Sequence, residues 1–137
     1  MTEKIQRIIS SGKRKTAVAR AIITSGSGKI TINKKNYKQL GIFDKLKIEE
    51  PMKITESVLG KTNFDVIVNV KGGGEKAQVD AARLALAKAI IKFSKSEELT
   101  NAFLKYDRNL LVADVRRKEQ CKPGDSKARK MRQSSKR

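Results

Sequence analysis

The chain lacks histidine and tryptophan, and it has one cysteine, Cys121. Without histidine, Ser-His-Asp and Cys-His nucleophilic catalysis is excluded. The usual zinc sites need several Cys or His ligands and are excluded as well. A single cysteine cannot form an internal disulfide, which favours a reducing compartment. We therefore expect Cys121 to be a passive residue, and we expect no cofactor, no metal and no small-molecule substrate.

Positive charge dominates what is present. The 32 Lys and Arg against 14 Asp and Glu give a net charge of +18. Residues 116–137 alone hold ten basic and two acidic side chains, and no aromatic or β-branched residue. Such a segment cannot bury enough apolar surface to offset the entropy of ordering it, so it should order only against a polyanion. We divide the chain into a globular body, residues 1–115, and an extended basic tail, residues 116–137.

Nucleic acid is the leading partner class for so basic a chain. An anionic membrane is the main competitor, but the tail has no Trp, Leu or Phe with which to insert into one. Residues 1–15 contain no apolar core of a secretory signal. No run approaches the roughly 20 apolar residues that span a bilayer. We expect no membrane partner and a cytoplasmic location.

Alternating apolar residues predict strands in the body. The strands are expected over residues 5–10, 16–24, 29–33 and 64–71. Ser11-Gly12 is expected to break the first strand, and Gly26-Ser27-Gly28 to join the second and third in a hairpin. The same-face sets are Ala17, Ala19, Ala21 and Ile23 in one strand, Ile30 and Ile32 in the next, and Phe64, Val66, Val68 and Val70 in the last.

Helical spacing accounts for most of the rest. Residues 34–59 predict two short helices, one capped by Asp44 and one with Pro51 in its first turn. A long helix is expected over residues 75–93 and a second over residues 96–105, with Ser96 as N-cap. The apolar stripe of the long helix is Ala82, Leu86, Ala89, Ile90 and Phe93. Strands followed by packed helices indicate an α+β fold of one domain.

Three glycine-lysine fragments resemble phosphate loops, and each lacks a required residue. Gly12-Lys13-Arg14 and Gly28-Lys29-Ile30 lack the terminal hydroxyl residue. Gly60-Lys61-Thr62 lacks the first glycine and precedes a strand. A small-molecule phosphotransferase is therefore the least favoured function.

Two features of the body have both a structural and a functional interpretation. Residues 72–74, Gly-Gly-Gly, form either a tight turn that needs positive φ or a place where a phosphate backbone approaches closely. Lys13, Arg14, Lys15 and Arg20 are either a solvated edge or a phosphate-contact stripe. The second interpretation is favoured for both features. For Arg83 and Lys88 on the long helix, the two interpretations are even.

The chain resembles the universal small-subunit ribosomal protein S-nine family, from about residue 8 to residue 137. The resemblance rests on GKRKTAVARA from residue 12, GxGKIxIN from residue 26, EP at residue 50 and VKGGG from residue 70. It continues in YDRxLLVADxRRxE from residue 106 and in the tail residues Lys127, Ala128, Arg129, Gln133, Ser135 and Arg137. The YDR-LLVAD-RR-E stretch is similar to the archaeal and eukaryotic branch. Ala77 stands where members of the family usually have a glycine before Gln78, and the Lys136-Arg137 ending differs from the Tyr-Arg ending of that branch.

The resemblance implies a mostly antiparallel four-stranded sheet packed on helices, as in the second domain of ribosomal protein S-five, with an extended basic tail. It implies a structural, non-enzymatic constituent of the small ribosomal subunit. The partners would be small-subunit ribosomal RNA (rRNA), neighbouring proteins of the subunit head and, at the end of the tail, the anticodon stem-loop of the peptidyl-site transfer RNA (tRNA).

The charges and the resemblance together give a set of expected contact residues. Lys136 and Arg137 are expected to contact tRNA. The expected rRNA contacts are Lys13, Arg14, Lys15, Arg20, Gly72, Gly73, Gly74, Arg83, Arg108, Arg116, Arg117, Lys118, Lys122, Lys127, Arg129, Lys130, Arg132, Gln133 and Ser135. The main alternative is a non-specific nucleic-acid compactor, which predicts similar affinity for duplex DNA and rRNA.

Overall fold

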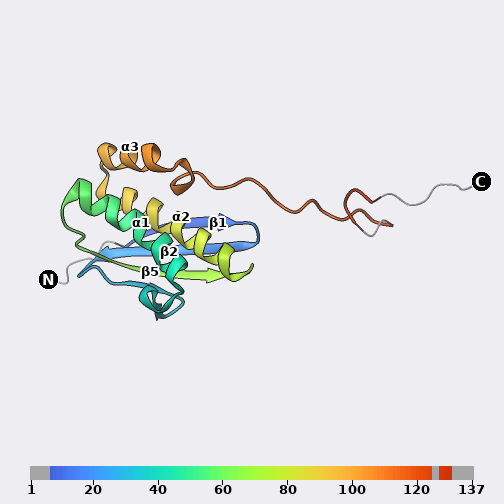
Figure 1. Ribbon diagram of the computed structural model, residues 1–137, viewed down its shortest axis with the longest axis horizontal. Coiled ribbons are helices and arrows are strands. Elements are labelled where there is room, and N and C mark those ends of the chain that lie inside the picture. The colour runs from blue at the N-terminus through green and yellow to red at the C-terminus, as the bar shows by residue number, and fades with distance from the viewer. Residues whose placement is uncertain (1–6, 125–126, 131–137) are drawn as a thin grey trace, which may run out of the picture.

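The computed structural model describes residues 7–124 and 127–130, and its body is an α+β domain in which helices cover one face of a sheet (Figure 1). The strands are β1 Ile8–Arg14, β2 Ala17–Ser25, β3 Ile30–Ile32, β4 Lys35–Asn36 and β5 Phe64–Lys71. The α-helices are α1 Ile42–Leu59, α2 Glu75–Ser94 and α3 Glu97–Tyr106, and the 3-10 helices are η1 Tyr37–Gln39 and η2 Arg108–Leu110. The expected fold class is confirmed. The 5-stranded sheet has one strand more than expected, because short β4 pairs with β3 at the edge.

The strand order β1-β2-β5-β3-β4 differs from the predicted pairing. The hairpin predicted between residues 16–24 and 29–33 is wrong, because β5 lies between β2 and β3. β5 pairs antiparallel with β2 and parallel with β3, so the most regularly apolar strand occupies the centre. The actual hairpin joins β1 and β2 through Lys15, which has a φ of 52°.

Gly12 does not end the first strand, as predicted, because β1 continues through it to Arg14. A Cβ at Gly12 would lie 2.4 Å from the Ala81 carbonyl oxygen and 2.7 Å from the Ala85 nitrogen of α2. The missing side chain therefore lets the backbone of α2 approach the strand. The buried side chains of the paired strand β2 are small as well: Ala17 and Ala19 are both fully buried.

Helix α2 packs on β1, β2 and β5 of the sheet and also contacts α1, so it is buried on more sides than its predicted stripe (Figure 1). Its stripe residues are buried, except that Phe93 is partly exposed. The predicted core faces of β2 and β5 are confirmed as well. The additional buried residues of α2 are Val79, Ala81, Leu84, Ala85 and Ala87.

Residues 42–59 form one helix, not the two predicted, and the N-cap of α1 is Gly41, not Asp44. Pro51 lies inside this helix with Ile48 and Thr55, and all three are buried. The burial of this part of α1 therefore outweighs the usual cost of an internal proline. Asp44 instead forms an ion pair with Lys76 of α2 at 3.0 Å.

Helix α3 begins as predicted, since the Ser96 hydroxyl accepts a hydrogen bond from the Leu99 amide. Among the helices of the described residues, none has the length and apolar content needed to cross a membrane.

Asp65 of β5 holds the loop that follows β2. Its Oδ1 accepts hydrogen bonds from the amides of Lys29 (2.8 Å) and Ser27 (2.9 Å). These bonds lower the pKa of Asp65 from its ordinary value of 3.8, and the bond from the Lys29 amide has the largest effect. The loop is thereby fixed beside β5, where β3 begins.

A group whose pKa is lower in the folded state stabilises the fold above its unfolded-state pKa. That contribution is lost as the pH falls through the lower, folded-state value. We predict that Asp65→Asn removes this part of the acid dependence, because the amide oxygen accepts hydrogen bonds without titrating. Urea unfolding as a function of pH measures the effect. Identical acid dependence in the two proteins would contradict the prediction.

Candidate nucleic-acid interface

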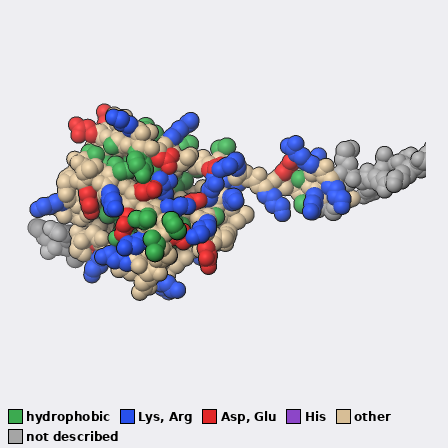
Figure 2. All heavy atoms as spheres, viewed as in Figure 1, with side chains coloured by type: hydrophobic (Ala, Val, Ile, Leu, Met, Phe, Trp, Pro, Cys, Tyr) green, Lys and Arg blue, Asp and Glu red, His purple; other side chains and the backbone are tan. Residues whose placement is uncertain are grey.

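The start of the tail meets the β1–β2 turn in a basic groove. Among the residues that the structure describes, its lining comprises five cations, Thr16 and Val18 and includes no acid, and its volume is about 740 Å³. We call this surface the cationic groove. Figure 2 shows Lys and Arg side chains along the tail and over the adjoining end of the body. The five cations of the groove are Lys13, Lys15, Arg116, Arg117 and Lys118.

Arg20 lies apart from the groove, on the sheet face opposite the helices. The register places it between Ser11 of β1 and Asn69 of β5. Val18 precedes it on the same face, beside Lys71. The predicted stripe is thus divided, with Lys13 and Lys15 in the groove and Arg20 further along the exposed sheet face.

The glycine turn between β5 and α2 separates into two parts. Gly72 and Gly73 have φ values of 76° and 70°. A Cβ at Gly72 would lie 2.8 Å from the Thr16 oxygen, and one at Gly73 would lie 2.9 Å from the Ala17 nitrogen. Internal packing against the β1–β2 hairpin therefore explains these two glycines.

Packing against the hairpin does not explain Gly74. Its φ of −89° suits any residue, and a Cβ there would meet nothing within 4 Å. It is the N-cap of α2 and provides no side-chain cap. The amides of the first turn are oriented toward the N-terminal end of the helix. Of the three glycines, Gly74 is the one with open space where a phosphate backbone could approach, and its contact with RNA stays a prediction.

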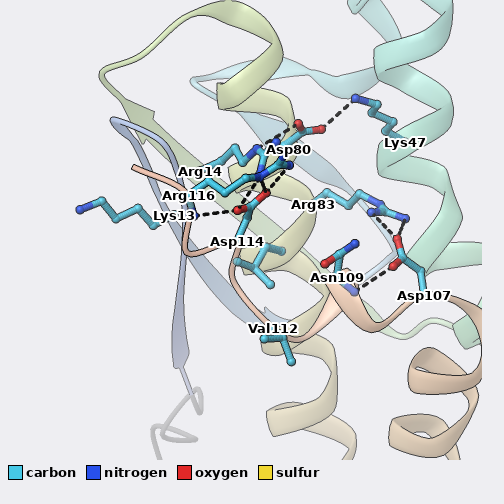
Figure 3. A pocket seen from close by; sticks show the side chains of 11 residues that line it. Lys13, Arg14, Lys47, Asp80, Arg83, Asp107, Asn109, Val112, Asp114 and Arg116 are labelled. Carbon is cyan, nitrogen blue, oxygen red and sulfur yellow. Dashed lines mark hydrogen bonds and ion pairs between the residues drawn. The ribbon is translucent and has the colours of Figure 1, made fainter. Parts of the chain in front are cut away.

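A cluster of ion pairs lies beneath the start of the tail (Figure 3). The Arg14 guanidinium forms an ion pair with Asp114 and lies 3.8 Å from Asp80 of α2. Asp80 also accepts a hydrogen bond from the Lys47 ammonium of α1 at 2.8 Å. Arg116 pairs with Asp114 at 2.7 Å. We call these five residues the tail-root cluster, since they connect β1, α1 and α2 to the segment from which the tail departs.

Arg83 forms ion pairs with two carboxylates beside the tail-root cluster. Both of its terminal nitrogens donate to Asp107 at 3.1 Å, and it also pairs with Glu50 of α1. The exposed fractions of the Arg83 and Arg14 side chains are 16% and 22%. These two predicted contact residues therefore form ion pairs with carboxylates of the protein itself. Their role in binding RNA stays a prediction.

Sequence analysis missed the acids of this region. Asp80 and Asp107 come from segments far from Arg14 and Arg83 in the sequence. Asp114 was visible in the LLVAD-RR stretch, as the one acid directly before the basic tail. An acid at the boundary between the body and the basic tail is the signal from which its role could have been predicted.

The remaining predicted contacts lie in η2 and the tail. Arg129 donates to Glu119 at 2.8 Å, so two described segments of the tail are in contact. Residues Arg132, Gln133, Ser135, Lys136 and Arg137 lie outside the described residues. The exposed predicted contacts are Arg108, Arg116, Arg117, Lys118, Lys122, Lys127, Arg129 and Lys130.

Comparison with known proteins finds one family across body and tail. The family model described as "Ribosomal protein S9/S16" matches residues 12–137. The small ribosomal subunit protein uS9 of Methanococcus vannielii is 53% identical over 116 residues, which are 84% of this chain and 85% of that protein. That of Thermoplasma volcanium is 47% identical over 129 residues, 93% of this chain and 96% of that protein. That of Desulfurococcus amylolyticus is 40% identical over 136 residues, covering 98% and 96%. These archaeal relatives agree with the branch expected from the sequence.

The division of the glycine turn can be tested with alanine at each position. We predict that Gly72→Ala and Gly73→Ala lower the free energy of unfolding by about 1–3 kcal/mol, since each new Cβ meets the hairpin at positive φ. We predict that Gly74→Ala lowers the free energy of unfolding by less, about 0.5–1 kcal/mol, because alanine is a poorer N-cap than glycine, and that it weakens binding to a small-subunit rRNA transcript. Urea unfolding and filter binding provide the two measurements. Unchanged RNA affinity in Gly74→Ala would contradict the external role of this position.

Proposed function

Since the chain belongs to the ribosomal protein S9/S16 family, we propose that it is a structural protein of the small ribosomal subunit that binds rRNA of the subunit head. The cationic groove is the observation that carries this proposal. Five exposed Lys and Arg side chains converge there, and no acid is among the described residues of the lining. Such a surface binds the phosphate backbone and releases condensed counterions.

The family consists of structural ribosomal proteins, and the chain is not an enzyme. The positions of the glycine-lysine fragments agree with this. Gly60 is the C-cap of α1, and Lys61 and Thr62 lead into β5, so that fragment opens no helix. Gly28 lies in the loop held by Asp65. Neither fragment has the strand-to-helix context of a phosphate loop.

Binding of the body and binding of the tail have different physical roles in this proposal. The β1–β2 turn and Gly74 belong to the rigid body and define where the protein sits on folded RNA. The tail starts at the groove and carries exposed cations throughout its described part, residues 116–124 and 127–130. Its Arg side chains form bidentate contacts with phosphates that the body does not reach. Lys136 and Arg137, at the end of the tail, are proposed to contact the peptidyl-site tRNA.

The proposed partners are therefore small-subunit rRNA, peptidyl-site tRNA and neighbouring proteins of the subunit head, in cytoplasmic ribosomes. The alternative of a general nucleic-acid compactor differs in specificity. A compactor binds through charge alone, so duplex DNA and rRNA compete equally for it. A family member with a shaped groove discriminates between the two at high salt.

The test is co-sedimentation of the full chain with ribosomal subunits and with duplex DNA, at low and at high salt. We expect retention with small subunits at high salt, where binding to DNA is lost, because specific contacts add to the screened charge term. Equal loss from both at modest salt would overturn the proposal in favour of the compactor.

A truncated chain without residues 136–137 tests the role of the tail's end. We expect subunits that assemble normally and bind peptidyl-site tRNA more weakly, because Lys136 and Arg137 are proposed to contact tRNA only. Reconstituted subunits with and without the two residues are compared by tRNA filter binding. Failed assembly with normal tRNA binding in the residual subunits would contradict this division of roles.

A further inference from the structure

We propose that the Asp114 carboxylate is a positioning group, which holds the start of the tail against the β1–β2 turn and so builds the cationic groove from its two halves. This inference rests on the proposed binding of rRNA by that groove. It assigns an RNA-binding role to an acid, although the surface around it is strongly basic.

Asp114 is the last residue of the body to be partly buried. Its side chain is 20% exposed, whereas Val115 is 86% exposed and every described residue from 116 to 124 is exposed as well. Apolar packing has therefore ended at this point. The Val112 amide, which donates to the Arg108 carbonyl, is the last backbone contact with η2 that the described residues make before the tail.

The Asp114 carboxylate contacts both halves of the groove. From the tail it accepts hydrogen bonds from the Arg116 amide (2.8 Å), Nε (3.0 Å) and Nη2 (2.7 Å). From the body it receives the Arg14 guanidinium of β1. Lys13 and Lys15, on either side of Arg14, are the groove cations of the body. One carboxylate thus fixes the distance between the two sets of groove cations.

The contact is rigid on the body side. Arg14 is also within 3.8 Å of Asp80, and Lys47 bonds Asp80 from α1 (Figure 3). Arg14 is only 22% exposed, whereas Arg116 is 79% exposed. The body therefore presents a fixed guanidinium, and Asp114 attaches the exposed tail to it. Groove cations that are already placed lose less conformational entropy on binding than free ones.

This role predicts an effect of opposite sign to that of simple charge. If Asp114 were only a negative charge on a basic surface, removing it would strengthen binding to a polyanion. If it positions the groove, removing it weakens binding, because residues 116–118 must then be ordered by the RNA. The sign of the change therefore separates the two explanations.

The experiment measures the affinity of the full chain for a small-subunit head rRNA transcript over a range of salt concentrations. We compare wild type with Asp114→Asn, Asp114→Glu and Glu98→Gln. The last is a matched control, because it makes the same change of charge at an exposed position of α3. Thermal unfolding of each variant is measured alongside.

We expect Asp114→Asn to bind roughly three- to tenfold more weakly, which is the cost of ordering one or two long side chains. Its salt slope should fall by about 0.7–0.9 for each phosphate that the groove no longer neutralises. Asp114→Glu keeps the carboxylate and should restore most of the affinity. Glu98→Gln should bind as wild type or slightly more tightly.

NMR order parameters of the free protein give a readout that does not depend on RNA. We expect them to fall at residues 115–118 in Asp114→Asn and to stay unchanged in the β1–β2 hairpin. Unchanged order at residues 115–118, or loss of order throughout the body, would overturn the positioning role.

The failure of this inference is distinguishable from that of the proposed function. If wild type shows no preference for rRNA at high salt, the proposed function fails. If wild type binds rRNA specifically and Asp114→Asn binds equally well or more tightly, the function stands and Asp114 is not a positioning group.

Discussion

The close approach of α2 to the sheet is the constraint on which the rest of the structure depends. It is possible because Gly12 has no side chain where the backbone of α2 passes and because the facing residues of β2 are alanines. A helix so close to the sheet carries its polar residues to the strand ends. Asp80 of α2 thereby reaches Arg14 of β1. The basic surface is therefore organised by a contact between small residues in the core.

The sequence predicted what local periodicity determines. The faces of β2 and β5, the stripe of α2 and the cap of α3 depend on neighbours within a few residues, and all are confirmed. Strand pairing was not predictable in this way, since β5 displaces β3 from β2 for reasons that lie outside either segment. Pro51 and Gly12 were misinterpreted for the same reason. Each breaks a local rule that tertiary packing outweighs.

The candidate site shows the same division between local and distant information. Counting charges located the basic segments, and the structure joins two of them into the cationic groove. Counting did not reveal the ion pairs of Arg14 and Arg83, because their carboxylates come from α1, α2 and the segment after α3. Arg14 and Arg83 are largely buried as well as paired, whereas Arg116 pairs with Asp114 and still has 79% of its side chain exposed to a phosphate. The glycine turn gives a parallel case, since packing against the hairpin explains Gly72 and Gly73 but not Gly74.

The central position of β5 has a consequence for the order in which the chain folds during synthesis. β1 and β2 are close in sequence and can pair as soon as both are made. β3 and β4 follow, but their neighbour in the sheet is β5, which comes after the whole of α1. The two strand pairs therefore remain separate, each with an open edge, until residue 71 has left the ribosome. Insertion of β5 then closes both edges in one step, and the nascent chain is most exposed to wrong strand pairing just before it.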